Sequence, residues 1–271
     1  MKRILTTAFL TTMVLGSTMT FTSCSSDDDD SPSTVTTPQQ VFTGGLPKSV
    51  GNMTIETNAK GQVVSVKDGN ETATFEYKEA ASRSTASSPD VIMTVVYENE
   101  KLVCNLHLNK EGFVSHCDET ENYTYGTQTE TENETWDFTY NKDGQLLSMR
   151  RSEGKETTTI KYQDGNIVET STVSADEPDE SDSYKISYTS DAVTSPIANK
   201  GCIMLFDQTL GIDLDEMEYA YYAGLLGKAT KNLPVKLVED GDYTLNFSWT
   251  LNSSGYPTLL KYDNETCSFA W

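Results

Sequence analysis

The sequence of 271 residues contains none of the residue patterns that mark several common catalytic sites. Neither Gly-x-Ser-x-Gly nor His-Glu-x-x-His occurs, and a phosphate-binding glycine loop is missing, which argues against serine hydrolases, zinc proteases and nucleotide-binding enzymes of those types. Cys-x-x-Cys is missing as well, so a thioredoxin-like redox site is not expected. Histidine is scarce, with two copies in the whole chain. The sequence therefore predicts no catalytic residues and no cofactor.

Positive charge is also scarce, because 20 Lys and Arg stand against 41 Asp and Glu for a formal net charge of -21. A chain this acidic is repelled by phosphate backbones, so nucleic acid is not an expected partner. The apolar stretch from Ile4 to Met19 is too short and too rich in threonine to span a bilayer stably. It follows Lys2 and Arg3 and is typical of an export signal that is removed.

Cys24 stands where cleavage of that signal is expected, directly after Phe21-Thr22-Ser23. The arrangement resembles a relaxed bacterial lipobox, whose cysteine is lipidated and becomes the first residue of the mature chain. The serine pair and the four aspartates at 25–30 resemble the surface-export signal of Bacteroidota lipoproteins. Each buried acyl methylene contributes about 0.8 kcal/mol to membrane attachment. We therefore expect an outer-membrane lipoprotein, exposed at the cell surface or, alternatively, facing the periplasm.

Composition divides the chain into a signal peptide (1–23), an acidic Ser/Thr/Asp tether (24–45) and a single antiparallel β domain (46–271). The tether has too little apolar surface to offset its ordering entropy. Short alternating apolar runs in the domain predict strands with one solvated face, about 12–15 in number. A sheet of that size curls, closes into a barrel-like form or splits. One helix is predicted near 205–227, where it could plug a barrel, link two sheets or cover a sheet edge, and we expect the last.

A four-residue turn of the form Asn-x-x-Gly recurs between alternating strands. Its copies are Asn58–Gly61, Asn109–Gly112, Asn141–Gly144 and Asn252–Gly255. Asn at the first position can bond the backbone two residues on, and Gly at the fourth accepts the left-handed conformation. A register in which the residues flanking each loop are directly opposed pairs Ile55 with Val64 and Phe138 with Leu147, and it places apolar groups on one face.

The same register makes predictions about the cysteines and histidines of one hairpin. It sets Cys104 directly opposite Cys117 on the apolar face, so a cross-strand disulfide is a candidate in an oxidising compartment, with buried thiols as the alternative. It sets His107 opposite Val114, with His116 diagonal to His107 on the other face. Because two imidazoles without a third nearby ligand make a poor metal site, we predict no metal there.

Several motifs resemble those of known bacterial families. Tyrosine-ended strands followed by polar Asp-Gly turns, at Thr139–Gly144 and Lys161–Gly165, resemble the YD-type repeats of secreted bacterial proteins. Tyr222–Lys228, Asn232–Pro234 and Ser254–Thr258 resemble a Bacteroidota lipoprotein family of unknown function with a porin-like antiparallel β-fold. The resemblance covers most of the chain after the tether. It implies a fold and transfers no active site.

Aromatic residues around one hairpin are the remaining candidates for ligand contact, because their faces can stack on sugars and apolar ligands, although rings on alternating strands are often core. They are Tyr123, Tyr125, Trp136, Phe138 and Tyr140. The leading interpretation is a non-enzymatic binding or structural module of the cell envelope, with a glycan, a peptide or an envelope protein as ligand. The alternative is an extracytoplasmic glycan-degrading enzyme that uses paired carboxylates. The oligomeric state is left open.

Overall fold

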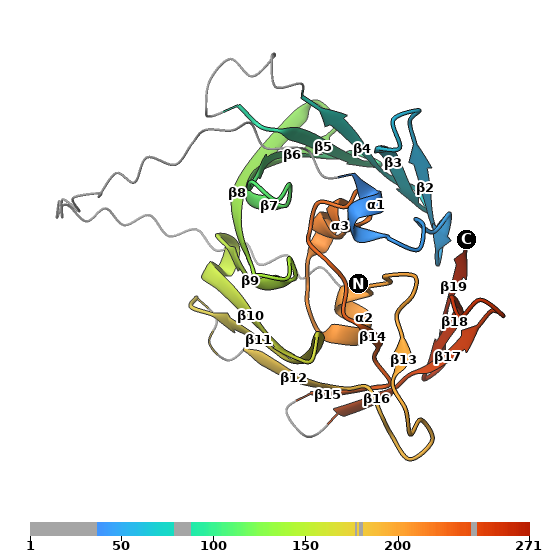
Figure 1. The fold of residues 1–271 in the computed structure, drawn as a ribbon. Coiled ribbons are helices and arrows are strands. Elements are labelled where there is room, and N and C mark those ends of the chain that lie inside the picture. The colour runs from blue at the N-terminus through green and yellow to red at the C-terminus, as the bar shows by residue number, and fades with distance from the viewer. Residues whose placement is uncertain (1–36, 79–87, 177, 179–180, 240–242) are drawn as a thin grey trace. The chain divides into compact units, whose positions relative to one another are not determined.

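The computed structural model describes residues 37–78, 88–176, 178, 181–239 and 243–271 (Figure 1). The chain divides into a unit of residues 1–31 and a unit of residues 32–271. The signal peptide, Cys24 and most of the tether lie outside the described residues, so the lipid anchor stays a prediction. No helix among the described residues is long and apolar enough to cross a membrane.

Strands make up most of the described chain, as predicted. They are β1 (Ser49–Val50), β2 (Met53–Thr57), β3 (Val63–Asp68), β4 (Glu71–Tyr77), β5 (Val91–Tyr97), β6 (Glu100–Leu108), β7 (Val114–Tyr125), β8 (Gln128–Tyr140), β9 (Leu146–Arg151), β10 (Glu156–Gln163), β11 (Asn166–Ser174), β12 (Asp182–Ser187), β13 (Ile197–Ala198), β14 (Asn232–Leu233), β15 (Lys236–Glu239), β16 (Tyr243–Asn246), β17 (Ser248–Leu251), β18 (Pro257–Tyr262) and β19 (Glu265–Ala270). The helical elements are α1 (Pro38–Val41), η2 (Glu153–Lys155), α2 (Phe206–Leu210), η4 (Asp215–Met217) and α3 (Glu218–Tyr222).

Antiparallel pairing joins 17 of these strands into one curved sheet that is nearly closed (Figure 1). Strands β2 to β12 pair in sequence order, and β12 continues to β15. Strand β16 pairs with β15, whereas β17, which follows directly after Phe247, pairs with β18. The two-residue β1 pairs with both β2 and β19, so it joins the first and last parts of the sheet. The mainly antiparallel, barrel-like prediction is confirmed.

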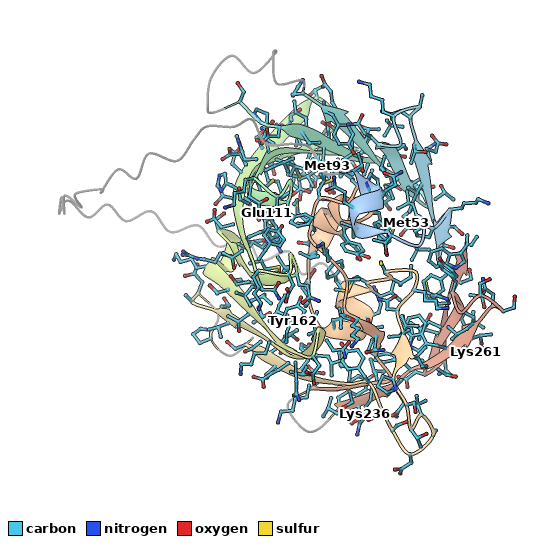
Figure 2. The ribbon with its side chains drawn as sticks, in the orientation of Figure 1. Met53, Met93, Glu111, Tyr162, Lys236 and Lys261 are labelled. Atoms are coloured by element: carbon cyan, nitrogen blue, oxygen red, sulfur yellow. The ribbon has the colours of Figure 1, made fainter. Side chains whose placement is uncertain are left out.

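The space inside the curved sheet is filled by residues 203–231, which we call the inner segment (Figures 1 and 2). Tyr221 and Tyr222 are 1% and 0% exposed, and their hydroxyls donate to the backbone carbonyls of Cys202 and Met204. The backbone of the inner segment also bonds the sheet, because Val114 N–H donates to Leu225 O at 2.8 Å and Lys228 N–H donates to Gly144 O at 2.8 Å. The core is therefore shared between the sheet and this segment.

The prediction of one helix covering a sheet edge was wrong. The region forms the short helices α2 and α3 and the 3-10 turn η4, all enclosed by the sheet (Figure 1). Consecutive residues from Tyr219 to Leu226 are nearly all apolar, and an element that is apolar all round belongs inside a protein. An edge-covering helix would instead keep one polar face.

The predicted tether also ends too late at residue 45. Residues Pro38–Val41 form α1, and Val41 and Phe42 are 3% and 1% exposed. The ring of Phe42 lies 5.3 Å from that of Tyr221, so α1 packs on the inner segment. These two apolar residues are the local signal that separates α1 from the polar stretch before it.

The four Asn-x-x-Gly loops share one hydrogen-bond pattern, which confirms the predicted turn. In the loop at Asn141, the Gly144 N–H donates to Asn141 O at 3.0 Å, and Asn141 Oδ1 accepts from the N–H groups of Asp143 and Gln145. Gly144 has φ +79°, in the region that glycine adopts without strain. The loops at Asn58, Asn109 and Asn252 repeat these bonds.

The predicted register was wrong by two residues along most of each hairpin. Ile55 pairs with Val66 and Phe138 with Met149. Next to each loop, the observed pairing differs from the predicted register by one residue, as in Tyr140 with Leu146. A bulge one residue further along the strand adds a second shift, so that Thr139 pairs with Ser148. The other three hairpins show the same two shifts. Because two single-residue shifts restore the side-chain alternation, the same faces meet but with different partners.

Replacing Asn141 with alanine tests the role of the loop. Asn141→Ala removes the acceptor of two backbone N–H groups, so the free energy of unfolding should fall by about 1 kcal/mol. The control is Asp143→Ala, which removes an exposed side chain from the same loop. Urea unfolding followed by circular dichroism measures both, and equal losses would contradict the assigned role of the asparagine.

Candidate functional site

The structure separates the five predicted ligand-contact aromatics into buried and accessible rings. Trp136 and Phe138 are 1% and 4% exposed, and their rings stack with centroids 6.0 Å apart. Tyr140 donates its hydroxyl to a backbone carbonyl of β7 at 2.7 Å. Tyr123 is half-buried and Tyr125 is 56% exposed. The first three rings belong to the core on the inner face of strands β6 to β9, which we call the wall. Ligand contact stays a prediction for Tyr123 and Tyr125.

Cys104 and Cys117 are buried, free thiols on the inner face of that wall. The observed register places Cys104 opposite Glu119 and Cys117 opposite Leu106, so the thiols are diagonal neighbours and their directly opposed pairing was a wrong prediction. The Sγ of Cys104 lies 3.7 Å from Glu119 Oε2. The hydrogen bond with Cys117, burial and the charge of Glu119 raise the pKa of the Cys104 thiol, which disfavours a reactive thiolate. The disulfide itself stays a prediction.

Arg151 organises the carboxylates on the inner face of β8 and β9. Its Nε lies 3.0 Å from Glu134 Oε2 and its Nη1 lies 2.6 Å from Asp215 Oδ2, and it also pairs with Glu153. The guanidinium lies 4.9 Å from the ring centroid of Trp136. Because Asp215 belongs to η4, this cluster connects the sheet to the inner segment.

Two of the acids near Arg151 are held in an environment that disfavours their charge. Burial raises the pKa of Glu134 to about 7, against the opposing effect of Arg151. Burial also raises the pKa of Glu119, whose Oε2 accepts a hydrogen bond from Trp136 Nε1 at 3.1 Å. Glu119 and Glu134 are directly opposed on β7 and β8, an arrangement that is unfavourable when both are charged. Arg151 is therefore needed to hold these acids in the wall.

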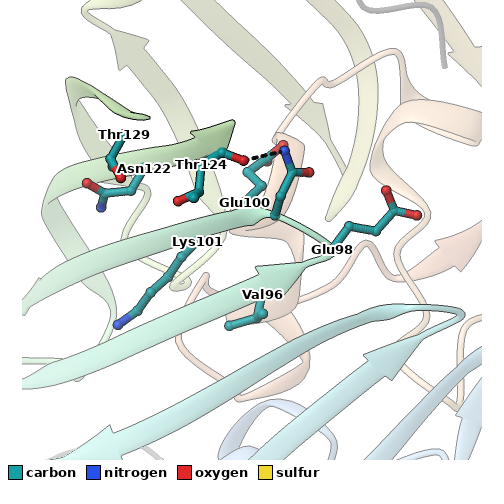
Figure 3. A pocket seen from close by; sticks show the side chains of 8 residues that line it. Val96, Glu98, Glu100, Lys101, Asn122, Thr124 and Thr129 are labelled. Carbon is teal, nitrogen blue, oxygen red and sulfur yellow. Dashed lines mark hydrogen bonds between the residues drawn. The ribbon is translucent and has the colours of Figure 1, made fainter. Parts of the chain in front are cut away.

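A shallow pocket of about 600 Å³ lies at the end of the same wall (Figure 3). Its lining consists of Val96, Glu98, Asn99, Glu100, Lys101, Asn122, Thr124 and Thr129. We call it the rim pocket. Alternation along the strands places Val96, Lys101 and Asn122 on the outer face of the sheet, whereas Cys104 is buried on the inner face. Asn99 Nδ2 donates to Thr124 O at 3.0 Å, which fastens the β5–β6 turn to β7.

The rim pocket therefore offers amide, hydroxyl, carboxylate and ammonium groups around an apolar patch at Val96. Such a lining can bind a polar, hydroxyl-rich ligand.

Comparison with known proteins identifies the fold family. Residues 55–259 match the family described as a domain of unknown function (DUF4595) with porin-like fold. The match covers more than half of the chain. The chain belongs to this family.

Solved structures agree with the DUF4595 assignment. A porin-like protein from Bacteroides uniformis superposes with a TM-score of 0.55 at 18% identity, covering 80% of this chain and 89% of its own. A porin-like protein from Bacteroides vulgatus gives a TM-score of 0.52 at 14% identity, covering 84% and 99%. At these identities the likeness shows the fold alone. No curated protein matches the chain.

Sequence reasoning missed Arg151 as a central residue of this DUF4595 domain. A signal was present, because strand alternation from the apolar Met149 places Arg151 on the same inner face. A cation on an apolar face predicts nearby carboxylates. The rim pocket had no comparable signal, since its lining comes from several strands and a turn.

Replacing Arg151 with methionine should strongly destabilise the protein. The change keeps an apolar stem against Trp136 but leaves several half-buried carboxylates unpaired, so the free energy of unfolding should fall by about 3 kcal/mol at pH 8. The loss should shrink at pH 5. Because the folded pKa of Glu134, about 7, lies above its ordinary value, proton uptake favours the folded state as pH falls through that range.

Arg150→Met is the matched control for Arg151→Met, because Arg150 is exposed on the same strand. It should change stability by less than about 0.5 kcal/mol. Denaturant unfolding at both pH values makes the comparison. Equal effects of the two changes, or a loss for Arg151→Met that does not depend on pH, would count against the electrostatic role.

Proposed function

We propose that this protein is a lipid-anchored, extracytoplasmic module that binds a glycan at the rim pocket. Cys24 and the acidic tether deliver the domain to the outer membrane, most simply at the cell surface. The proposal extends the family assignment, which gives a fold and leaves the function open.

The observation that carries the proposal is the rim pocket itself. Its Asn122, Thr124 and Thr129 side chains lie on the outer face, where a ligand can reach them without displacing the inner segment. Uncharged amides and hydroxyls match the donor and acceptor pattern of sugar hydroxyls. Tyr125 is exposed, but alternation along β7 directs its ring to the face opposite to Thr124, so it does not line the pocket.

The packed interior supports an outer location for the ligand. The inner segment fills the space within the sheet with side chains such as Leu225 and Tyr222, which are fully buried. A ligand that entered this space would have to displace these side chains. Their exposure would cost about 2 kcal/mol of hydrophobic stabilisation for each large side chain. The rim and outer face are therefore the accessible surfaces for binding.

The glycan prediction can be tested on the purified domain with a glycan array followed by calorimetry. Asn122→Ala and Thr129→Ala remove hydrogen-bonding groups from the rim pocket and should weaken binding of the captured glycan at least tenfold. The control Thr159→Ala lies on the exposed face of β10 and should leave affinity unchanged. Binding that survives both pocket changes would place the site elsewhere.

The anchor prediction is independent of the ligand. Cys24→Ala removes the thiol that would be acylated, so the protein should leave the membrane fraction and lose radiolabelled palmitate. Cys202→Ala is the control, because it removes a thiol of the folded domain and should leave attachment unchanged. Protease treatment of intact cells then tests surface exposure. Membrane attachment that persists in Cys24→Ala would contradict the lipoprotein assignment.

Glycan hydrolysis is the second candidate function, and one observation favours it. Glu134, with a pKa of about 7, lines a hollow of about 360 Å³ together with Glu132, Asn133, Ser152 and Glu153. A carboxylic acid that stays protonated near neutral pH can act as a general acid. Turnover of a captured glycan that disappears in Glu134→Gln would favour the enzyme over the binding module.

A further inference from the structure

The β7–β8 hairpin separates its charged and uncharged side chains onto different faces. Residues 120–133 are half-buried or exposed, so both faces of this part of the hairpin meet solvent. The inner face carries every acid of this stretch, in the directly opposed pairs Glu121–Glu132, Tyr123–Glu130 and Tyr125–Gln128. The outer face, which we call the ribbon face, carries only threonine and asparagine, in the pairs Thr120–Asn133, Asn122–Thr131 and Thr124–Thr129.

Folding alone does not account for this separation. Polar and apolar residues alternate along a strand when one face of the sheet is buried, but neither face is enclosed here. Repulsion would be weaker if the acids were divided between the faces, because Glu121 and Glu132 are directly opposed. A requirement for an uncharged outer face accounts for the pattern, in a chain whose formal net charge is -21.

Hydrogen bonds between the two strands hold the side chains of the ribbon face in place. Thr120 Oγ1 donates to Asn133 Oδ1 at 2.9 Å, and Thr131 Oγ1 donates to Asn122 Oδ1 at 2.9 Å. These bonds use the hydroxyl protons and the amide oxygens, so the amide N–H groups and the hydroxyl lone pairs remain for a ligand. Because the side chains are already ordered, binding a ligand here costs little side-chain entropy.

The ribbon face continues the rim pocket along the strands. Asn122, Thr124 and Thr129 belong to both (Figure 3), whereas Thr120 and Asn133 lie beyond the pocket. Steps of two residues, about 7 Å each, spread the three pairs over about 14 Å of each strand. Since this is longer than one sugar ring, a ligand that reaches from the pocket to the far pair is a chain of several sugars.

The composition of the ribbon face selects among ligands. It lacks the aromatic, arginine and large apolar side chains that anchor protein–protein interfaces. An anionic polymer is not favoured, because Lys101 of the rim pocket stands beside Glu98 and Glu100 in a strongly acidic chain. Amide and hydroxyl groups instead match sugar hydroxyls, each of which can both donate and accept.

We propose that the ribbon face extends the glycan site and that its ligand is an uncharged, linear polysaccharide. This extension rests on the proposed function, in which the glycan occupies the rim pocket. Further sugars lie on the ribbon face, where Nδ2 of Asn122 and of Asn133 donates to sugar hydroxyls and the threonine oxygens accept from them. The uncharged face determines the class of glycan, and the length of the ribbon determines how many sugars are bound.

Affinity electrophoresis of the purified full chain tests the ligand class. The gels contain dextran, mannan, inulin or xylan as uncharged polysaccharides, and polygalacturonate or heparin as anionic ones. At least one uncharged polysaccharide should retard the protein, and neither anionic one should. Retardation by an anionic polysaccharide, or by none of the six, would overturn the proposal.

Calorimetry with a disaccharide and a hexasaccharide of the retarding polysaccharide separates the ribbon face from the rim pocket. The double change Thr120→Ala, Asn133→Ala removes hydrogen-bonding groups outside the pocket, so hexasaccharide affinity should fall about tenfold. Disaccharide affinity should stay the same, which also shows that the fold is kept. Asn122→Ala changes the pocket itself and should weaken the binding of both.

Gln128→Ala is the matched control, because it removes an exposed amide from the inner face of the same hairpin and should leave both affinities unchanged. Hexasaccharide affinity that survives the double change but falls in Asn122→Ala would overturn the ribbon-face proposal and leave the rim pocket standing. Sedimentation velocity tests a different occupant. A dimer that the double change dissociates would assign the face to a second copy of the chain and would also overturn the proposal.

Discussion

The structure depends on filling the interior of a curved antiparallel sheet with the chain's own residues. A sheet of this size that bends into a near-closed ring encloses a space, and protein interiors tolerate little empty volume. The inner segment supplies the filling, with Tyr221, Tyr222 and Leu225 at its centre. Its backbone also hydrogen-bonds to the sheet, because Leu225 O accepts from Val114 N–H and Lys228 N–H donates to Gly144 O. Sheet curvature and inner segment are therefore mutually dependent.

This arrangement determines where function can lie. With the interior packed, the groups that can meet a ligand are on the rim and the outer face, which is where the rim pocket and the ribbon face are found. On the inner face, Arg151 forms ion pairs with Glu134 and Asp215, and the pair with Asp215 connects the sheet to η4. The wall formed by β6 to β9 thus has a structural inner face and an accessible outer face.

The sequence predicted those features that depend on local chemistry. Each Asn-x-x-Gly loop has its own acceptor and its own glycine, so the turn follows from four residues, and alternation then predicts the strands. Register could not be predicted, because the second shift beside each loop leaves the pattern of faces unchanged. That error hid the pairing of His107 with His116 and the true partner of Cys104.

The inner segment was also misplaced, although its composition contained the information. The run from Tyr219 to Leu226 is apolar on every side, which is typical of an enclosed element, yet its helical spacing suggested a one-sided helix. Residues of the rim pocket come from the β5–β6 and β7–β8 hairpins, and no short sequence pattern predicts the pocket that forms where these hairpins meet. Local turns and strand content were therefore predictable, whereas enclosure and the assembled sites were not.

Native-state hydrogen exchange tests most directly whether the inner segment is an integral part of the core. The Leu225 N–H, bonded to Ala220 O, and the Val114 N–H, bonded to Leu225 O, should exchange as slowly as the amides of Met93 and Val95 in β5. Exchange of these inner amides at the rate of exposed loops, while β5 stays protected, would contradict the account. It would mean that the sheet stands without the segment that fills it.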